Sequence, residues 1–141
     1  MVAISTFNTS TITLSSARAA IDAGLEAAKA MGIPMSIVIV DPSGLPKAVA
    51  RMDGASILTY EVAYKKAWTA AVTGAPTAGV HQFITSDAGS LLSMPHMDNF
   101  SVVAGGLPLR ANENCVGAIG VSGATAELDL KVAEACAAAL V

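Results

Sequence analysis

The chain has 141 residues, of which 53% are hydrophobic, 4% aromatic and 13% charged, and its formal net charge is −3. This length suits one domain with an aliphatic core that needs neither metals nor disulfides, and the lack of a basic cluster argues against nucleic-acid binding. The charged fraction is about half of the ~25% usual in soluble domains, so we expect further copies of the chain to cover apolar surface.

The first segment, residues 1–12, is rich in Ser, Thr and Asn and predicts an N-terminal arm on a single domain that spans 1–141. No basic region followed by an apolar core is present, so no signal peptide is indicated. No apolar run reaches the ~18 residues of a membrane span. We therefore expect a cytoplasmic protein that binds a small molecule and contacts neither a membrane nor nucleic acid.

Apolar residues at helical spacing predict a first helix over 14–31, which Thr13 caps and Gly32 ends. A compact apolar strand over 35–40 follows, and a tight turn leads back into a second strand over 47–52. These two strands are expected to form an antiparallel hairpin.

A second helix is predicted over 56–72, where alanines at helical spacing form a face that can press closely on a sheet. A short helix over 77–83 comes next. Residues 85–99 are the least regular part, and a loop of this length in a compact domain is often functional. A third strand is predicted over 100–104.

The Gly-rich stretch 104–125 contains a short strand, a polar turn and a buried strand over 115–121, and a final helix follows over 126–140. Gly117 and Gly120 inside the buried strand indicate that something packs closely there, and helix-on-sheet packing is favoured over a ligand wall. The order of the elements predicts an α+β fold with one five-stranded antiparallel sheet flanked by helices.

Among the polar residues, none forms a G-x-S-x-G, H-E-x-x-H or P-loop motif. His96 lies in the irregular loop, and Asp98, two residues on, can orient its imidazole. Arg110 at a strand end suits a ligand carboxylate or a salt bridge to another subunit. Lys65 can hold a ligand carboxylate, or pair with Glu61 four residues earlier.

One functional hypothesis is a cofactor-free hydrolase, deaminase or isomerase that acts on a small unsaturated or amino carboxylate from organic-acid or aromatic-compound catabolism. His96 would be the general acid/base and Arg110 the carboxylate clamp. The backbone amides of Gly105 and Gly106 would steady a developing oxyanion. A protein whose oligomer is itself the function is a further alternative.

Four segments carry a resemblance that spans nearly the whole chain. They are residues 14–17, Ile39-Val40-Asp41 with Arg51-Met52-Asp53-Gly54, Lys65-Lys66-Ala67-Trp68-Thr69-Ala70-Ala71, and Gly105-Gly106-Leu107-Pro108-Leu109 with Gly117-Ala118-Ile119-Gly120-Val121-Ser122-Gly123-Ala124-Thr125. Together they resemble the GlcG/HbpS-like family of small haem-binding or haem-degrading domains, also seen as the C-terminal domain of PduO-type proteins.

The resemblance implies a somewhat profilin-like sheet and dimers that often assemble into octamers. It also implies that the ligand is haem or a related tetrapyrrole, which is the leading hypothesis, and no separate metal site is expected. In haem-binding members a His near the first helix can bind the iron. Here that helix contains Arg18 and no His, so His96 or His81 would have to take this role.

Overall fold

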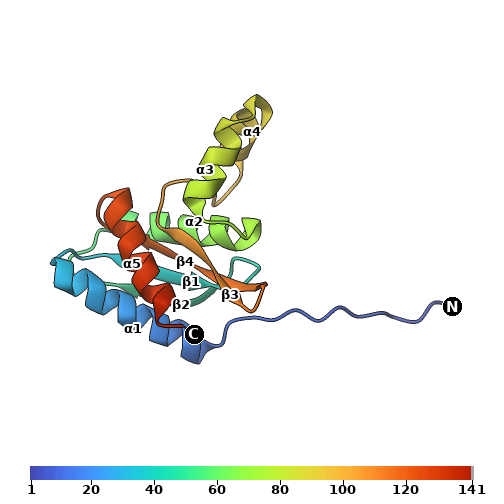
Figure 1. Ribbon diagram of the computed structural model, residues 1–141, viewed down its shortest axis with the longest axis horizontal. Helices are drawn as coiled ribbons and strands as arrows, with labels where there is room; N and C mark the ends of the chain where they lie inside the picture. The colour runs from blue at the N-terminus through green and yellow to red at the C-terminus, as the bar shows by residue number, and fades with distance from the viewer. Residues whose placement is uncertain (141) are drawn as a thin grey trace.

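The computed structural model describes residues 1–140, in which a four-stranded antiparallel sheet is covered by helices on both faces (Figure 1). The strands lie in the order β2-β1-β4-β3 and are β1 (Ser36–Val40), β2 (Pro46–Arg51), β3 (Gly106–Ala111) and β4 (Asn114–Ser122). The helices are α1 (Leu14–Met31), α2 (Ile57–Thr73), α3 (Thr77–Thr85), α4 (Ala88–Ser93), the 3-10 turn η1 (Met94–His96) and α5 (Ala126–Ala138). Within residues 1–140 no helix is long and apolar enough to cross a membrane.

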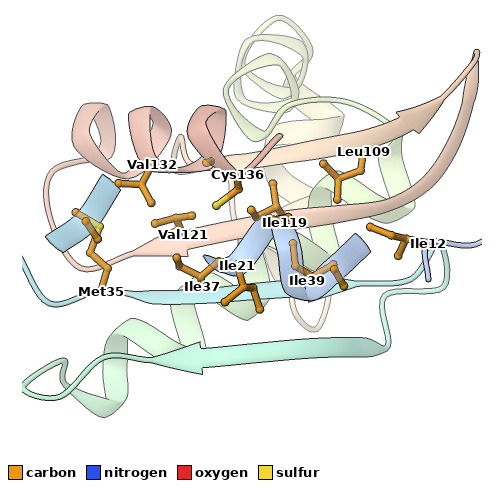
Figure 2. Close-up of a cluster of buried hydrophobic side chains, with 14 of the residues drawn as sticks. Ile12, Ile21, Met35, Ile37, Ile39, Leu109, Ile119, Val121, Val132 and Cys136 are labelled. Atoms are coloured by element: carbon orange, nitrogen blue, oxygen red, sulfur yellow. The ribbon is translucent and has the colours of Figure 1, made fainter. Parts of the chain in front are cut away.

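One face of the sheet packs against α1 and α5 and forms the larger part of the core (Figure 2). Ile37 of β1 and Ile119 of β4 point toward these helices, and Val132 and Cys136 of α5 meet them. All five residues of β1 are buried. Since successive side chains of a strand point to opposite faces, the other face must also be covered.

The other face of the sheet packs against α2. Val38 and Val40 meet the alanines of this helix, which include Ala63 and Ala67. A Cβ atom added to Gly120 of β4 would overlap the backbone of both alanines, so the helix rests directly on the strand. The predicted helix-on-sheet packing at this glycine is confirmed.

Local signals set the ends of several elements as predicted. Thr13 precedes α1, and its hydroxyl accepts a hydrogen bond from the backbone N–H of Ser16 at 3.1 Å. Gly32 ends α1 with φ of 69°, a left-handed conformation that glycine adopts at little cost. The β1–β2 hairpin is also confirmed, and in its turn Asp41 Oδ1 accepts hydrogen bonds from the N–H groups of Ser43 and Leu45.

The strand predicted over residues 100–104 is wrong, and the sheet therefore has four strands within residues 1–140 and not five. The backbone of this segment bonds to side-chain hydroxyls. Ser101 N–H donates to Thr69 Oγ1 at 2.9 Å, and Thr77 Oγ1 donates to the carbonyl of Val103 at 2.7 Å. These hydroxyls of α2 and α3 replace the partners that a neighbouring strand would supply.

Residues 77–97, here called the helical projection, extend away from the sheet and its helices (Figure 1). The expectation of irregular structure over 85–99 is wrong in part, because α4 and η1 lie there. Asp87 caps α4 by accepting a hydrogen bond from the N–H of Ser90 at 2.8 Å. The structure describes all six residues of α4, and none is buried.

Residues 1–11, here called the arm, are exposed and leave the body in an extended course (Figure 1). Ile12, which we expected to belong to the arm, is buried with 5% of its surface exposed. Its N–H donates to the carbonyl of Val116 in β4 at 2.8 Å. The body therefore fixes the point at which the arm begins.

Candidate functional site

A polar cavity of about 500 Å³, here called the His96 cavity, lies between α2 and the chain that follows α4. Its lining residues are Glu61, Lys65, Pro95, His96, Met97, Asp98, Asn99 and Phe100. Three residues that the sequence singled out, Lys65, His96 and Asp98, thus come together from two distant segments. Sequence spacing alone does not show this juxtaposition.

The chain reverses at Asn99, whose φ of 63° lies in the left-handed region that Asn tolerates better than most residues. The hydroxyl of Thr69, one turn after Lys65 in α2, donates to the carbonyl of Asn99 at 3.4 Å and also accepts the N–H of Ser101. The loop that carries His96 is therefore fastened to the helix that carries Lys65.

The charged groups of the His96 cavity are only weakly engaged. Lys65 Nζ lies 3.5 Å from Glu61 Oε1, with side chains that are 38% and 62% exposed. An exposed pair of this kind contributes about 0.3–0.5 kcal/mol, so the ammonium can turn to a ligand at small cost. His96 and Asp98 are both exposed, and among the hydrogen bonds of residues 1–140 none joins them.

Arg110 lies elsewhere. Its guanidinium donates to the carbonyls of Gly74 at 2.5 Å and Glu113 at 3.1 Å. It lines a second cavity, of about 710 Å³, between the root of the arm, the β3–β4 turn and the ends of α1 and α5. The structure therefore does not bring Arg110 and His96 to one cavity.

Gly105 and Gly106 line neither cavity and lie against α2 instead. A Cβ atom on Gly106 would come within 2.5 Å of the carbonyl of Lys66, and one on Gly105 within 3.0 Å of its Nζ. The N–H of Gly106 already donates to Thr77 Oγ1 at 3.1 Å. The lack of a side chain at these two glycines allows α2 to pack closely against them. The N–H of Gly106 already has a hydrogen-bond acceptor, so it is not available to stabilise an oxyanion.

A buried ion pair that was not predicted from the sequence joins α2 to α5. Lys66 Nζ donates to Asp129 Oδ2 at 2.8 Å and to the carbonyl of Val121 at 2.9 Å, and Asp129 Oδ1 accepts the N–H of Ala124 at 2.9 Å. The two side chains are 1% and 3% exposed. Burial lowers the pKa of Lys66, while the hydrogen bond and charge of Asp129 oppose this shift.

Taken together, these features define a small α+β domain in which helices cover both faces of an antiparallel sheet. Its candidate ligand cavity lies where the chain returns from the helical projection to the body, and both an exposed imidazole and an ammonium group line it. In the residues that the structure describes, no group of three or more His, Cys, Asp or Glu side chains is placed to hold a metal ion by itself.

The family model described as "Haem degrading protein HbpS-like" matches residues 12–138, and the chain belongs to this family. A crystal structure of a double mutant of HbpS from Streptomyces reticuli is similar over 100% of this chain and 97% of that one, with a TM-score of 0.89 and 32% identity. A crystal structure of a PduOC–haem complex matches 92% of this chain and 95% of that one, with a TM-score of 0.84 and 26% identity. An uncharacterised 15.0 kDa protein of Citrobacter freundii is 30% identical over 88% of each chain.

Proposed function

We propose that the protein binds haem or a related tetrapyrrole, with His96 as the iron ligand. The observation that carries this proposal is the presence of His96 and Lys65 in one open cavity. An imidazole is a common axial ligand of haem iron, and an ammonium can pair with a propionate. The family description and the haem complex of the PduOC structure support the choice of ligand. Haem would supply a redox-active iron.

The donors fit haem, but one copy of the chain provides little apolar cover. The carboxylates of Glu61 and Asp98 also line the His96 cavity, and they would repel the negatively charged propionates of haem. Apolar side chains lie exposed on the neighbouring helical projection, at Phe83, Leu91, Leu92 and Met97. We therefore propose that projections of two copies cover the macrocycle, in a dimer-based assembly that extends to the octamer implied by the resemblance.

The carboxylate-processing alternative loses its geometric support. It requires His96 as acid/base and Arg110 as clamp on one substrate, and these residues line different cavities. The guanidinium of Arg110 is also held by two backbone carbonyls.

His96→Ala is expected to remove high-affinity haem binding. Titration of the full chain with haemin, followed by the Soret band, should saturate at a fixed stoichiometry for the unchanged protein. Mutating an outer-shell residue of a metal site costs about 10–100-fold in affinity, so loss of the ligand itself should weaken binding by at least about 100-fold.

His81→Ala is the matched control for this variant, because His81 is an exposed histidine on α3 of the same projection and does not line the cavity. It should titrate like the unchanged protein. A normal Soret titration of His96→Ala, or loss of binding only in His81→Ala, would refute the assignment of the ligand.

Lys65→Ala is expected to weaken haemin binding about fivefold, the effect of losing an exposed ion pair worth about 1 kcal/mol. Haemin dimethyl ester lacks the propionate charge, so it should bind the unchanged protein and Lys65→Ala with equal affinity. Lys131→Ala provides the control, because Lys131 forms the same i,i+4 pair with Glu127 on α5, at 3.1 Å. Equal affinities of Lys65→Ala and Lys131→Ala for haemin would contradict the role of Lys65.

A further inference from the structure

The arm exposes apolar side chains that the body of its own chain does not cover. Val2, Ile4 and Phe7 are 97%, 94% and 89% exposed. No residue of 1–17 carries a charged side chain, so only the amino terminus brings a charge to this segment. Large apolar side chains left in water on an extended segment are typical of a surface that is covered by a partner.

The root of the arm directs it away from its own body. Ile12 is buried and hydrogen-bonded to Val116, so the arm begins at a fixed place on β4. Ten extended residues reach about 33 Å from that place. Residues 1–13 contain no Gly or Pro, the residues that best favour a tight reversal back onto the same chain.

The cavity that Arg110 lines, here called the arm-root cavity, is also lined by Thr11, Ile12 and Thr13. Its other lining residues come from the first turns of α1, from the β3–β4 hairpin, and from the end of α5 and the two residues beyond it. Among these described residues the guanidinium of Arg110 is the one charged group, and backbone carbonyls already hold it. The cavity therefore offers hydroxyl groups and aliphatic side chains, the same chemistry that the arm presents.

We propose that the arm of one copy lies in the arm-root cavity of a second copy, and that the exchange is reciprocal. Because the arm leaves the body beside this cavity, a two-fold axis near the root places each arm over the cavity of the other copy. The partner then contributes its own apolar arm residues to the cavity, which one copy leaves open. The arm and the helical projection leave the body in different directions (Figure 1), so this contact is independent of the proposed haem site.

The test follows a single thiol on the arm of the full chain. Ser5→Cys is introduced together with Cys115→Ser, which removes the half-buried thiol. Cys136 stays silent, because it is buried and burial raises its pKa to about 12. Alkylation of Cys at position 5 should become at least about tenfold slower as the protein concentration rises, as mass action requires when most arms are bound.

Ala19→Glu supplies the blocking variant, because Ala19 is an exposed residue of α1 that lines the arm-root cavity. It should restore rapid alkylation at high concentration and leave the haemin titration unchanged. Ala30→Glu, at an exposed position near the other end of α1, should not restore it. Protection that persists at dilutions where the protein elutes as a single copy from a sizing column would place the arm on its own body and overturn the proposal. Rapid alkylation at every concentration would overturn it equally.

Discussion

Replacing Lys66 by Met is expected to lower the free energy of unfolding by about 3–5 kcal/mol, the usual cost of breaking a buried ion pair from one side. The carboxylate of Asp129 would remain in a site that is 2% exposed, with the N–H of Ala124 as its remaining hydrogen-bond donor. The carbonyl of Val121 would also lose the ammonium. Urea denaturation at one fixed protein concentration measures the change, since assembly makes apparent stability depend on concentration.

Lys65→Met is the matched control, because Lys65 precedes Lys66 on the same helix and forms only an exposed pair with Glu61. Its cost should stay below about 0.5 kcal/mol. The double variant Lys66→Met with Asp129→Leu should recover part of the loss, because no unpaired charge remains buried. If Lys66→Met lowered the free energy of unfolding no more than Lys65→Met, the buried ion pair would not stabilise the contact between α2 and α5.

Gly120→Ala is expected to lower the free energy of unfolding by about 3 kcal/mol or more, at the upper end of the overpacking range. The added methyl group would overlap the backbone of Ala63 and Ala67, which cannot rotate away as a side chain can. The helix would have to lift from the sheet along its alanine face. Thermal or urea denaturation measures the loss, and a raised susceptibility of α2 to proteolysis would locate it.

Gly79→Ala tests whether the loss is specific to the contact. Gly79 lies in α3, and a Cβ atom added there meets nothing within 4 Å. Since Ala is the better helix former by about 1 kcal/mol, this variant should stabilise α3 slightly. A similar destabilisation of both variants would contradict direct packing at Gly120.

The parts of the fold that local chemistry decides could be predicted from the sequence. Thr13 and Gly32 mark the ends of α1 because a capping hydroxyl and a left-handed glycine act within one turn. Gly74 ends α2 in the same way, with φ of 66°. The continuous apolar strands and the alanine face likewise predicted a sheet covered by helices.

The segment 100–104 could not be predicted, because its apolar composition is that of a strand. Its hydrogen-bond partners are the hydroxyls of Thr69 and Thr77, which precede it by about thirty residues in the chain. A local sequence pattern carries no information on such distant partners.

The placement of Lys65 and His96 in one cavity could not be predicted for the same reason, because it depends on the course of the whole helical projection.

The position of Lys66 in the sequence does indicate a buried lysine. It falls at helical spacing with Ala63, Ala67 and Ala70, on the face of α2 that presses on the sheet. A lysine on a buried face needs an acidic partner, because an unpaired buried charge is costly. Asp129 lies in the first turn of the last helix, where an acidic residue is expected without any partner, and the long distance between the two residues in the sequence concealed the pair.

The helical projection has a consequence for how proteins of this architecture can diverge. None of the six residues of α4, all of which the structure describes, is buried, so substitutions there leave the interior undisturbed. Substitutions confined to α4 therefore leave the sheet and its covering helices intact, whereas Thr77, Val80 and Ile84 of the same projection are buried and belong to the packed body. Under the proposed function, changes confined to α4 can alter the cover over the ligand, and selection for a new ligand then need not compete with selection for folding.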